Sequence, residues 1–572
     1  MPRYEFAGSS GDKGAALRAP CTSAGGGSAA PARGFASGLK YTSAMATTTL
    51  TPTNSPSFAS PGITVPPPKR MRDFSASTIP DAGLPCTEKC KHFNDYCQFR
   101  ADSLGHPGAF VHFGTFDMPI GLGKNRTIGI YCSALSEGLQ EDATMRICIF
   151  EDRGAIDLEP LTLTRPVFDL WCGLSPLGER VCEIFRPTEL GFVVRPMLAP
   201  VVAEQRPGTP INDFDWLRSQ RIVLVNARWM PPADFHPDSY FQDGPLVTTC
   251  NGAVVAAAVE SKHLDDFALT TLDQLLEDWK HTLPRREVGG SLIHRPWDLV
   301  ERNAGQINDD FAARRPQFPI EAVHHIALLG SNCSLCIAPG AQVEPYVVAD
   351  TRKGPVVIDR DAVIGAFTRL EGPCYIGQRT QLFGAKVRAG STIGPNCRIG
   401  GEVEASIIQG NSNKYHEGFL GHSYVGEWVN IGAGAQTSDL RHDYGEVIVS
   451  VGGMRVPTGS SKVGSFIGDH SKIGLGALLN SGTMIGAFAA ILPAGRLLPK
   501  NVPSFCSVLH GEVAENEDID VLFATASEVM ARRGMRLTPA QSELYRNVYL
   551  QTATQRKQAL PQTEPRRLRR SA

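Results

Sequence analysis

Four of the histidines in the C-terminal half of the chain offer two kinds of chemistry: His416, His422, His442 and His470. An unperturbed imidazole has a pKa of about 6.5, so a neutral histidine can accept a proton from an attacking amine or hydroxyl. Three converging imidazoles with an open fourth position would instead bind zinc. His416 falls in a break of a repeat, where a structural histidine has less reason to occur. We therefore expect His416 to be a general base, with a zinc site as the alternative.

Other side chains could bind phosphate or a metal ion. Lys386 and Arg388 stand on alternate positions and could hold a phosphate, although such a pattern is also common on a solvated face. Arg165 is a second phosphate candidate, and Glu151 or Asp152 could hold Mg²⁺ for nucleotidyl transfer. That reaction usually uses a glycine-rich loop whose backbone amides approach a triphosphate. The nearest segment, LTLTRP at 161–166, contains no glycine.

A repeat of six residues must position the histidines. An aliphatic residue returns at Ile467, Ile473, Leu479, Ile485, Ile491 and Leu497. This period matches neither a helix nor an ordinary strand. It indicates a parallel β-helix, in which each unit is one short strand plus one turn, three units close a coil, and side chains stack about eighteen residues apart.

The same spacing extends upstream with two breaks. Its members are Ile358, Ile364, Leu370, Ile376, Leu382, Val387, Ile393, Ile399, Val425 and Ile431. The breaks cover residues 401–423 and 436–464. We predict that both are loops expelled from the solenoid, where binding and catalytic groups commonly lie.

Residues 145–318 alternate between apolar strands and helical segments. Strands are predicted at 146–152, 221–228, 244–250 and 252–260, and helices at 167–185, 269–283 and after Pro296. Such alternation predicts an α/β domain with a mixed sheet. The β-helix is expected to follow at 319–512.

The two ends of the chain have a different character. Residues 1–144 begin with a long Ser-, Thr-, Gly- and Pro-rich stretch and are predicted to be disordered or to have no assignable fold. As a hypothesis, the working protein begins at Met145, directly before the first strand. Residues 513–572 are predicted to form helices and a basic tail, with Thr538 and Pro539 starting the second helix. These helices are expected to cover the open end of the solenoid.

The composition excludes several classes of protein. With 56 basic and 58 acidic residues, the net charge of -2 gives no case for nucleic-acid binding. No apolar run approaches the ~18 residues of a membrane span, and the N-terminus lacks a signal-peptide core. Fourteen cysteines without a dense framework indicate reduced thiols. We predict a soluble, cytoplasmic protein. Two cysteine groups remain as alternative zinc sites: Cys86, Cys90 and Cys97 with His92, and Cys333 with Cys336.

Three motifs carry a resemblance to a known family: LEPLTLTRPVFDL (158–170), GNSNKYHEGFLGHSYVGEWVNIGAG (410–434) and GDHSKIGLGALLNSGTMIG (468–486). Together they resemble the bacterial GlmU-like proteins, in which a sugar nucleotidyltransferase-like domain precedes a left-handed β-helix acyltransferase domain. The resemblance covers Met145 to about Gly511 and part of the helical tail. It implies a homotrimer whose acetylation site lies between subunits.

The resemblance also implies roles for individual residues, with His416 matching the catalytic histidine. It assigns substrate binding to Lys386, Glu402, Glu404, Phe419 and Asn430. It assigns coenzyme binding to Asp439, Asp469 and Ala487. Glu404, Phe419 and Asp439 stand where the family has lysine, tyrosine and asparagine, and Lys386 replaces an arginine. The acceptor can therefore differ from glucosamine-1-phosphate.

The expected function is an acetyl-CoA-dependent acetylation of an amino-sugar phosphate. A backbone N–H around residues 433–436 would stabilise the oxyanion. In the alternative, the N-terminal domain is a sugar-1-phosphate nucleotidyltransferase that uses UTP or dTTP with Mg²⁺, and the β-helix only assembles the protein. The expected partners are small molecules and further copies of the chain.

Overall fold

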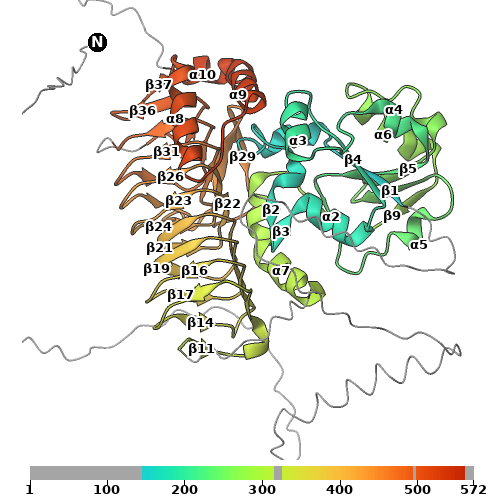
Figure 1. Cartoon of the computed structure of the whole chain (residues 1–572). Coiled ribbons are helices and arrows are strands. Elements are labelled where there is room, and N and C mark those ends of the chain that lie inside the picture. Colours follow the sequence, from blue (N-terminus) through green and yellow to red (C-terminus); the bar gives the residue numbers. More distant parts are fainter. Residues whose placement is uncertain (1–144, 315–324, 494–497, 561–572) are drawn as a thin grey trace, which may run out of the picture. The chain divides into compact units, whose positions relative to one another are not determined.

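The computed structural model describes residues 145–314, 325–493 and 498–560. The predicted fold class is confirmed: an α/β domain precedes a parallel β-helix, and helices follow it (Figure 1). The predicted N-terminal extension, the cysteine group at 86–97 and Leu497 lie outside the described residues.

The α/β domain is built on one mixed sheet with the strand order β4-β1-β5-β8-β7-β9. Its strands are β1 (Arg146–Phe150), β4 (Glu189–Val193), β5 (Ile222–Asn226), β7 (Leu246–Cys250), β8 (Ala253–Val259) and β9 (Arg285–Glu287). Only β8 runs antiparallel to its neighbours among these strands. Two short pairs accompany the sheet: β2 (Trp171–Cys172) with β3 (Ser175–Pro176), and β6 (Trp229–Met230) with β10 (Ser291–Leu292).

The helices that accompany this sheet are α2 (Leu177–Phe185), α3 (Ala199–Gln205), α4 (Phe214–Ser219), α5 (Asp238–Phe241) and α6 (Leu272–Thr282), with 3₁₀ turns η2 (Arg153–Leu158), η3 (Val167–Asp169) and η4 (Ser261–His263). Helix α7 (Pro296–Arg314) packs against β2 and the solenoid. The prediction of one helix over 167–185 is wrong in its first half. There the chain forms η3 and the β2–β3 hairpin, whose turn includes Gly173 at a φ of 77°. A positive φ is readily adopted by glycine and ends a helix.

Short parallel strands stack to form the β-helix, from β11 at one end to β36 at the other (Figure 1). The first coils contain β11 (Ala327–Leu329), η5 (Asn332–Ser334), β12 (Leu335–Ile337), β13 (Gln342–Val343), β14 (Val348–Asp350), β15 (Val356–Ile358), β16 (Val363–Ile364), β17 (Arg369–Glu371), β18 (Cys374–Ile376), β19 (Gln381–Val387) and β20 (Ser391–Ile393). The middle coils contain β21 (Arg398–Glu404), β22 (Ile407–Gly410), β23 (Asn413–Lys414), β24 (Phe419–Gly421), β25 (Tyr424–Glu427), β26 (Asn430–Ile431) and β27 (Gln436–Thr437). The last coils contain β30 (Ser465–Ile467), β31 (Lys472–Ile473), β32 (Leu478–Leu479), β33 (Thr483–Ile485), β34 (Ala490–Ile491), β35 (Asn501–Val502) and β36 (Cys506–Leu509).

The predicted hexad residues form the interior of the solenoid. From Ile358 to Ile491 each described member is at most 8% exposed, and they make one hydrophobic cluster. Most of these residues have an aliphatic Cα partner in the next coil, as Ile473 has Ile491. The six-residue period is therefore correctly assigned to a β-helix.

The two breaks in the repeat have different structures. The first, 401–423, is not an expelled loop, and that prediction is wrong. Strands β21 to β24 continue the solenoid through it, so His416 lies in a turn between β23 and β24. The second break does leave the solenoid after β27, as an antiparallel hairpin of β28 (Ile448–Val451) and β29 (Met454–Pro457).

The C-terminal helices α8 (Ile519–Ala531), α9 (Pro539–Gln551) and α10 (Ala553–Ala559) pack against one corner of the last coils. Thr538 caps α9 through a capping box and Pro539 is its first residue, as predicted. The Tyr545 ring contacts His470 and Phe488, which stack on each other with centroids 4.6 Å apart. The edge of β36 is paired with the antiparallel strand β37 (Glu512–Glu515), so strand and helices together protect this end.

A second hydrophobic cluster joins the α/β domain to the solenoid and to these helices. It includes Ile149 in β1, Phe466 in β30 and Leu544 in α9. The outward face of the β-helix is thus buried where the α/β domain lies on it. Within the described ranges, none of the helices combines the length and apolar character needed to cross a membrane.

Candidate functional site

Three predicted substrate residues form a row across adjacent strands of the solenoid. The parallel register pairs Lys386 of β19 with Glu402 of β21, and Glu402 with Phe419 of β24. Lys386 is exposed, whereas Glu402 and Phe419 are half-buried. Residues paired in register on neighbouring parallel strands point to the same face of the sheet, so the three outward side chains form one surface.

Ion pairs organise the acidic residues of this surface. The Arg388 Nε lies 2.6 Å from an oxygen of Glu402 and 3.8 Å from one of Glu404. Lys462, from the segment after β29, lies 3.8 Å from Glu404. The surface therefore presents mixed charge, with Lys386 as a further cation beside it.

His416 occupies the turn that leads into β24, at the corner beside this row. Its side chain is exposed, and its ring centroid lies 5.0 Å from that of Tyr415. Asn430 is also exposed, but on β26, where it pairs in register with Asn413. Because the turn joins β23 to β24, His416 lies between the face that carries Asn430 and the face that carries Phe419.

Asp439 lies in a pair with His422 that the sequence did not predict. The Nδ1 of His422 is 2.7 Å from Oδ2 of Asp439. Burial alone would raise the pKa of Asp439, but the hydrogen bond and charge of His422, together with Lys462, hold it below its usual value. The two residues are 17 positions apart in the chain, which is close to the length of one coil. This spacing is the feature of the sequence from which the pair could have been predicted.

Arg165 and Asp469 meet each other inside the protein. Arg165 forms an ion pair with Asp469, and its second partner, Glu427, is 3.3 Å away. Thr164 donates a hydrogen bond of 2.6 Å to Asp469, and the carboxylate also accepts the backbone N–H of Glu427 at 2.8 Å. Burial raises the pKa of Glu427, although Arg165 opposes this. This buried group joins the α/β domain to the solenoid.

Neither of the remaining coenzyme candidates is at the surface of this chain. Asp469 is 4% exposed and Ala487 is fully buried. The backbone N–H of Ala487 donates to the Ser504 hydroxyl at 3.0 Å.

The four histidines do not converge on one point. His416 and His442 are exposed, His422 pairs with Asp439, and His470 is buried beside Phe488. Across the part of the chain that the structure describes, no three His, Cys, Asp or Glu side chains gather as a metal site. The zinc alternatives within these residues, including Cys333 with Cys336, therefore have no structural support.

The α/β domain has its own candidate site, at the carboxyl end of β1. This strand lies between β4 and β5, and ligands of such sheets bind where the strand order reverses. Glu151 accepts two hydrogen bonds of 3.1 Å from the Arg195 side chain. Asp152 is paired with Arg228 at 2.5 Å. Both carboxylates suggested for Mg²⁺ thus have arginine partners.

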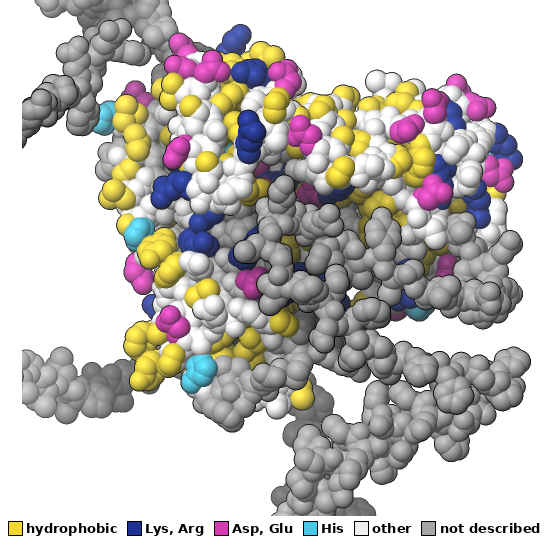
Figure 2. All heavy atoms as spheres, viewed as in Figure 1, with side chains coloured by type: hydrophobic (Ala, Val, Ile, Leu, Met, Phe, Trp, Pro, Cys, Tyr) yellow, Lys and Arg dark blue, Asp and Glu magenta, His cyan; other side chains and the backbone are white. Residues whose placement is uncertain are grey.

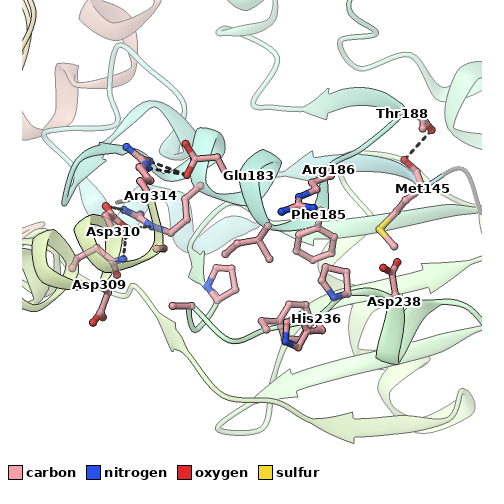
Figure 3. A pocket seen from close by; sticks show the side chains of 18 of the residues that line it. Met145, Glu183, Phe185, Arg186, Thr188, His236, Asp238, Asp309, Asp310 and Arg314 are labelled. Carbon is pink, nitrogen blue, oxygen red and sulfur yellow. Dashed lines mark hydrogen bonds and ion pairs between the residues drawn. The ribbon is translucent and has the colours of Figure 1, made fainter. Parts of the chain in front are cut away.

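Several cavities border this domain, and two of them are the largest in volume among those found in the described residues. One, of about 540 Å³, is lined by residues of the loop after β1, by the β28–β29 hairpin, and by Gln551, Gln555 and Gln558 near the C-terminus. The other, of about 860 Å³, is lined by residues of α2, α5 and α7 and by Met145, which precedes β1. Figure 3 shows Arg314 turned towards Glu183 at one side of this larger cavity. The smaller cavity begins at Ile156 in η2, so neither Glu151 nor Asp152 lines it.

The chain is similar to a family of sugar nucleotidyl transferases and to several bifunctional proteins. Residues 147–316 match the family model described as sugar nucleotidyl transferase. A bifunctional sugar-1-phosphate nucleotidylyltransferase/acetyltransferase of Sulfurisphaera tokodaii is 39% identical over 153 residues, which is 25% of this chain and 36% of that protein. The bifunctional protein GlmU of Synechococcus elongatus is 29% identical over 178 residues, which is 31% of this chain and 32% of that protein.

A longer match is with GlmU of a Picosynechococcus species, at 28% identity over 256 residues, 43% of this chain and 47% of that protein. The matched part of the chain thus spans 32% to 47% of the length of these relatives. These matches confirm the resemblance to GlmU-like proteins.

Proposed function

We propose that this protein transfers an acetyl group from acetyl-CoA to an amino-sugar phosphate, with His416 as the general base. The observation that carries the proposal is the row of Lys386, Glu402 and Phe419, with the exposed His416 at the adjoining corner. A cation, a carboxylate and an aromatic ring suit a phosphate, the polar groups of a sugar and its apolar face, respectively.

In this reaction His416 removes a proton as the acceptor amine attacks the thioester carbon. The carbon–sulfur bond then breaks and coenzyme A leaves as the thiol. Backbone N–H groups of residues 433–436 are the proposed donors to the developing oxyanion. Asn430, on the other side of the corner, is proposed to contact the sugar.

We infer that the acting form is a homotrimer. Large apolar side chains are exposed on several successive coils: Tyr346 (71%), Phe367 (74%), Tyr415 (45%), Leu475 (72%), Leu478 (63%), Leu492 (46%) and Leu509 (49%). We call this set the apolar corner. Figure 2 shows hydrophobic side chains gathered along the left edge of the solenoid. Exposed apolar patches of this extent mark protein interfaces, and Tyr415 adjoins His416, so a neighbouring copy would help to enclose the site.

The test is to incubate the purified protein with acetyl-CoA and a panel of amino-sugar phosphates while free thiol is measured. We expect thiol release that depends on one of the sugar phosphates. No release with any member of the panel, from a folded protein, would reject the proposal.

The second candidate is sugar-1-phosphate nucleotidyl transfer by the α/β domain. The family match over 147–316 favours it. The side chains at the carboxyl end of β1 do not fit a Mg²⁺ ion, because Glu151 and Asp152 are already paired with arginines. Pyrophosphate release from UTP or dTTP with Mg²⁺ and a sugar-1-phosphate would establish this activity.

A further inference from the structure

One interior position of the solenoid holds a lysine in place of an aliphatic residue. Lys414 of β23 pairs in register with Ile399 of the preceding coil and is only 2% exposed. The successive residues at this position are Ile364, Leu382, Ile399, Lys414, Ile431, Ile473, Ile491 and Val508. An isolated buried ammonium is costly, so its retention calls for a reason.

The ammonium of Lys414 holds two backbone carbonyls at the corner of the solenoid. Its Nζ donates to the carbonyl oxygen of Gly400 at 2.8 Å and to that of His416 at 3.1 Å. Burial lowers the pKa of Lys414 to about 8, although the charges of Glu417 and Glu402 oppose this.

The His416 carbonyl needs this donor because the backbone pairing at its corner is irregular. In the next coil, the carbonyl of Ala433, two residues after Ile431, accepts the N–H of Gly476. His416 is likewise two residues after the interior position. However, the N–H of Gly434 donates to the backbone carbonyl of Glu417, the residue after His416, and not to the carbonyl of His416. Lys414 therefore supplies the bond that the regular pairing would have given to the His416 carbonyl.

A shortened corner in the preceding coil explains the irregular backbone pairing. Between interior residues Ile399 and Val403 there are three residues, 400–402, whereas five, 415–419, separate Lys414 from Leu420. The turn that carries His416 thus extends beyond the corner before it. Lys414 connects the two corners, because its ammonium donates a hydrogen bond to a carbonyl in each of them.

We propose that Lys414 is a positioning residue for His416, which fixes the turn from inside the solenoid and so sets the direction of the imidazole. This rests on the proposed function, in which His416 is the general base. It accounts for a cation at a position where a neutral side chain would pack better. It also assigns a role to a residue that never reaches the surface.

The test is the Lys414→Met variant, since the unbranched methionine side chain fits an apolar interior. The protein should stay folded by circular dichroism, and kcat for thiol release should fall about ten- to a hundredfold, as expected for a displaced catalytic group. The KM for acetyl-CoA should change little, because Lys414 does not touch the solvent. If Lys414→Met fails to fold, Lys414→Ile takes its place, since isoleucine occupies this position in five other coils.

Lys472→Met is the matched control. Lys472 is also partly withdrawn from solvent, has a pKa that burial lowers to about 8, and donates to one backbone carbonyl, that of Trp428, at 2.8 Å. It does not contact the His416 turn, so its removal should leave kcat unchanged.

A double variant separates positioning from general damage. If Lys414 acts through His416, Lys414→Met should lower kcat no further in a His416→Ala background. The NMR signal of the His416 ring should shift in Lys414→Met and stay in place in Lys472→Met. An unchanged kcat in folded Lys414→Met, with His416→Ala inactive, would overturn this inference alone. An unchanged rate in His416→Ala would instead reject the proposed function.

Discussion

His416 and His422 flank the same short strand, β24, but their surroundings differ. His416 is exposed on its turn, whereas His422 is half-buried and oriented by Asp439. A base must be free to approach the acceptor, and the row from Lys386 to Phe419 ends beside His416. The geometry and the resemblance thus favour the same histidine.

Replacing His416 by alanine should lower kcat for thiol release by the ~10² to 10⁴ typical of general-base catalysis. Acetyl-CoA binding, measured by calorimetry, should be nearly unchanged because the solenoid interior is untouched. His422→Ala is the comparison variant and should have far less effect. A larger loss in His422→Ala would identify the His422–Asp439 pair as the base instead.

His470 gives a pH dependence of stability. Burial lowers its pKa to about 3, whereas in the unfolded chain the pKa should be near the ordinary histidine value of about 6.5. Between these values the unfolded state binds the extra proton. The free energy of unfolding should therefore fall as the pH drops from about 6.5 towards 3, by up to ~1.4 kcal/mol per pH unit.

The measurement is urea unfolding at several pH values between about 7 and 4. His470→Phe should flatten this slope, since phenylalanine can stack on Phe488 without titrating. His442→Phe, at an exposed position, should leave the slope as it is. Equal slopes in all three proteins would show that His470 is not the titrating group.

Among the elements, the coils from β21 to β24 show where sequence reasoning succeeds and where it stops. Hexads with an aliphatic residue at each sixth place identify the β-helix directly, because the interior admits little else. The coils around Lys414 lie in a segment that the sequence predicts as a loop, because the corner at 400–402 is shortened and one interior residue is a lysine. Both departures break the period in the sequence while the strands continue in space.

The contact between Arg165 and Asp469 could not be predicted in the same way. The two residues are 304 positions apart, and no repeat relates them. Arg165 is a phosphate candidate from its own segment, and the resemblance assigns Asp469 to the coenzyme by its position along the chain. The structure places both in the packed surface between the α/β domain and the solenoid.

Arg165→Met should destabilise the protein by about 3–5 kcal/mol, because it leaves the carboxylates of Asp469 and Glu427 without their cation in a buried place. The midpoint of urea unfolding measures this change. A triple variant, Arg165→Met with Asp469→Asn and Glu427→Gln, also removes both acidic charges. It should recover much of the stability that Arg165→Met loses. A single variant as stable as the parent would mean that the ion pair does not form.

At the scale of the whole molecule, the apolar corner should decide the state of association. Leu475→Glu places a charge in the proposed contact between copies, so sedimentation should show a monomer where the parent shows a trimer. Thiol release should fall with it if copies share the site. Leu550→Glu is the control, because Leu550 is 69% exposed on α9, against 72% for Leu475. A parent protein that sediments as a monomer would contradict the trimer.

The hydrophobic cluster that includes Ile149, Phe466 and Leu544 bears on how such a chain can change during evolution. Two modules joined by a linker can be exchanged freely, since neither depends on the other for folding. Here each half provides one side of a packed core, so substitutions on one side constrain those on the other. We therefore expect a hybrid with half of a relative to fold only where both sides of this core fit each other.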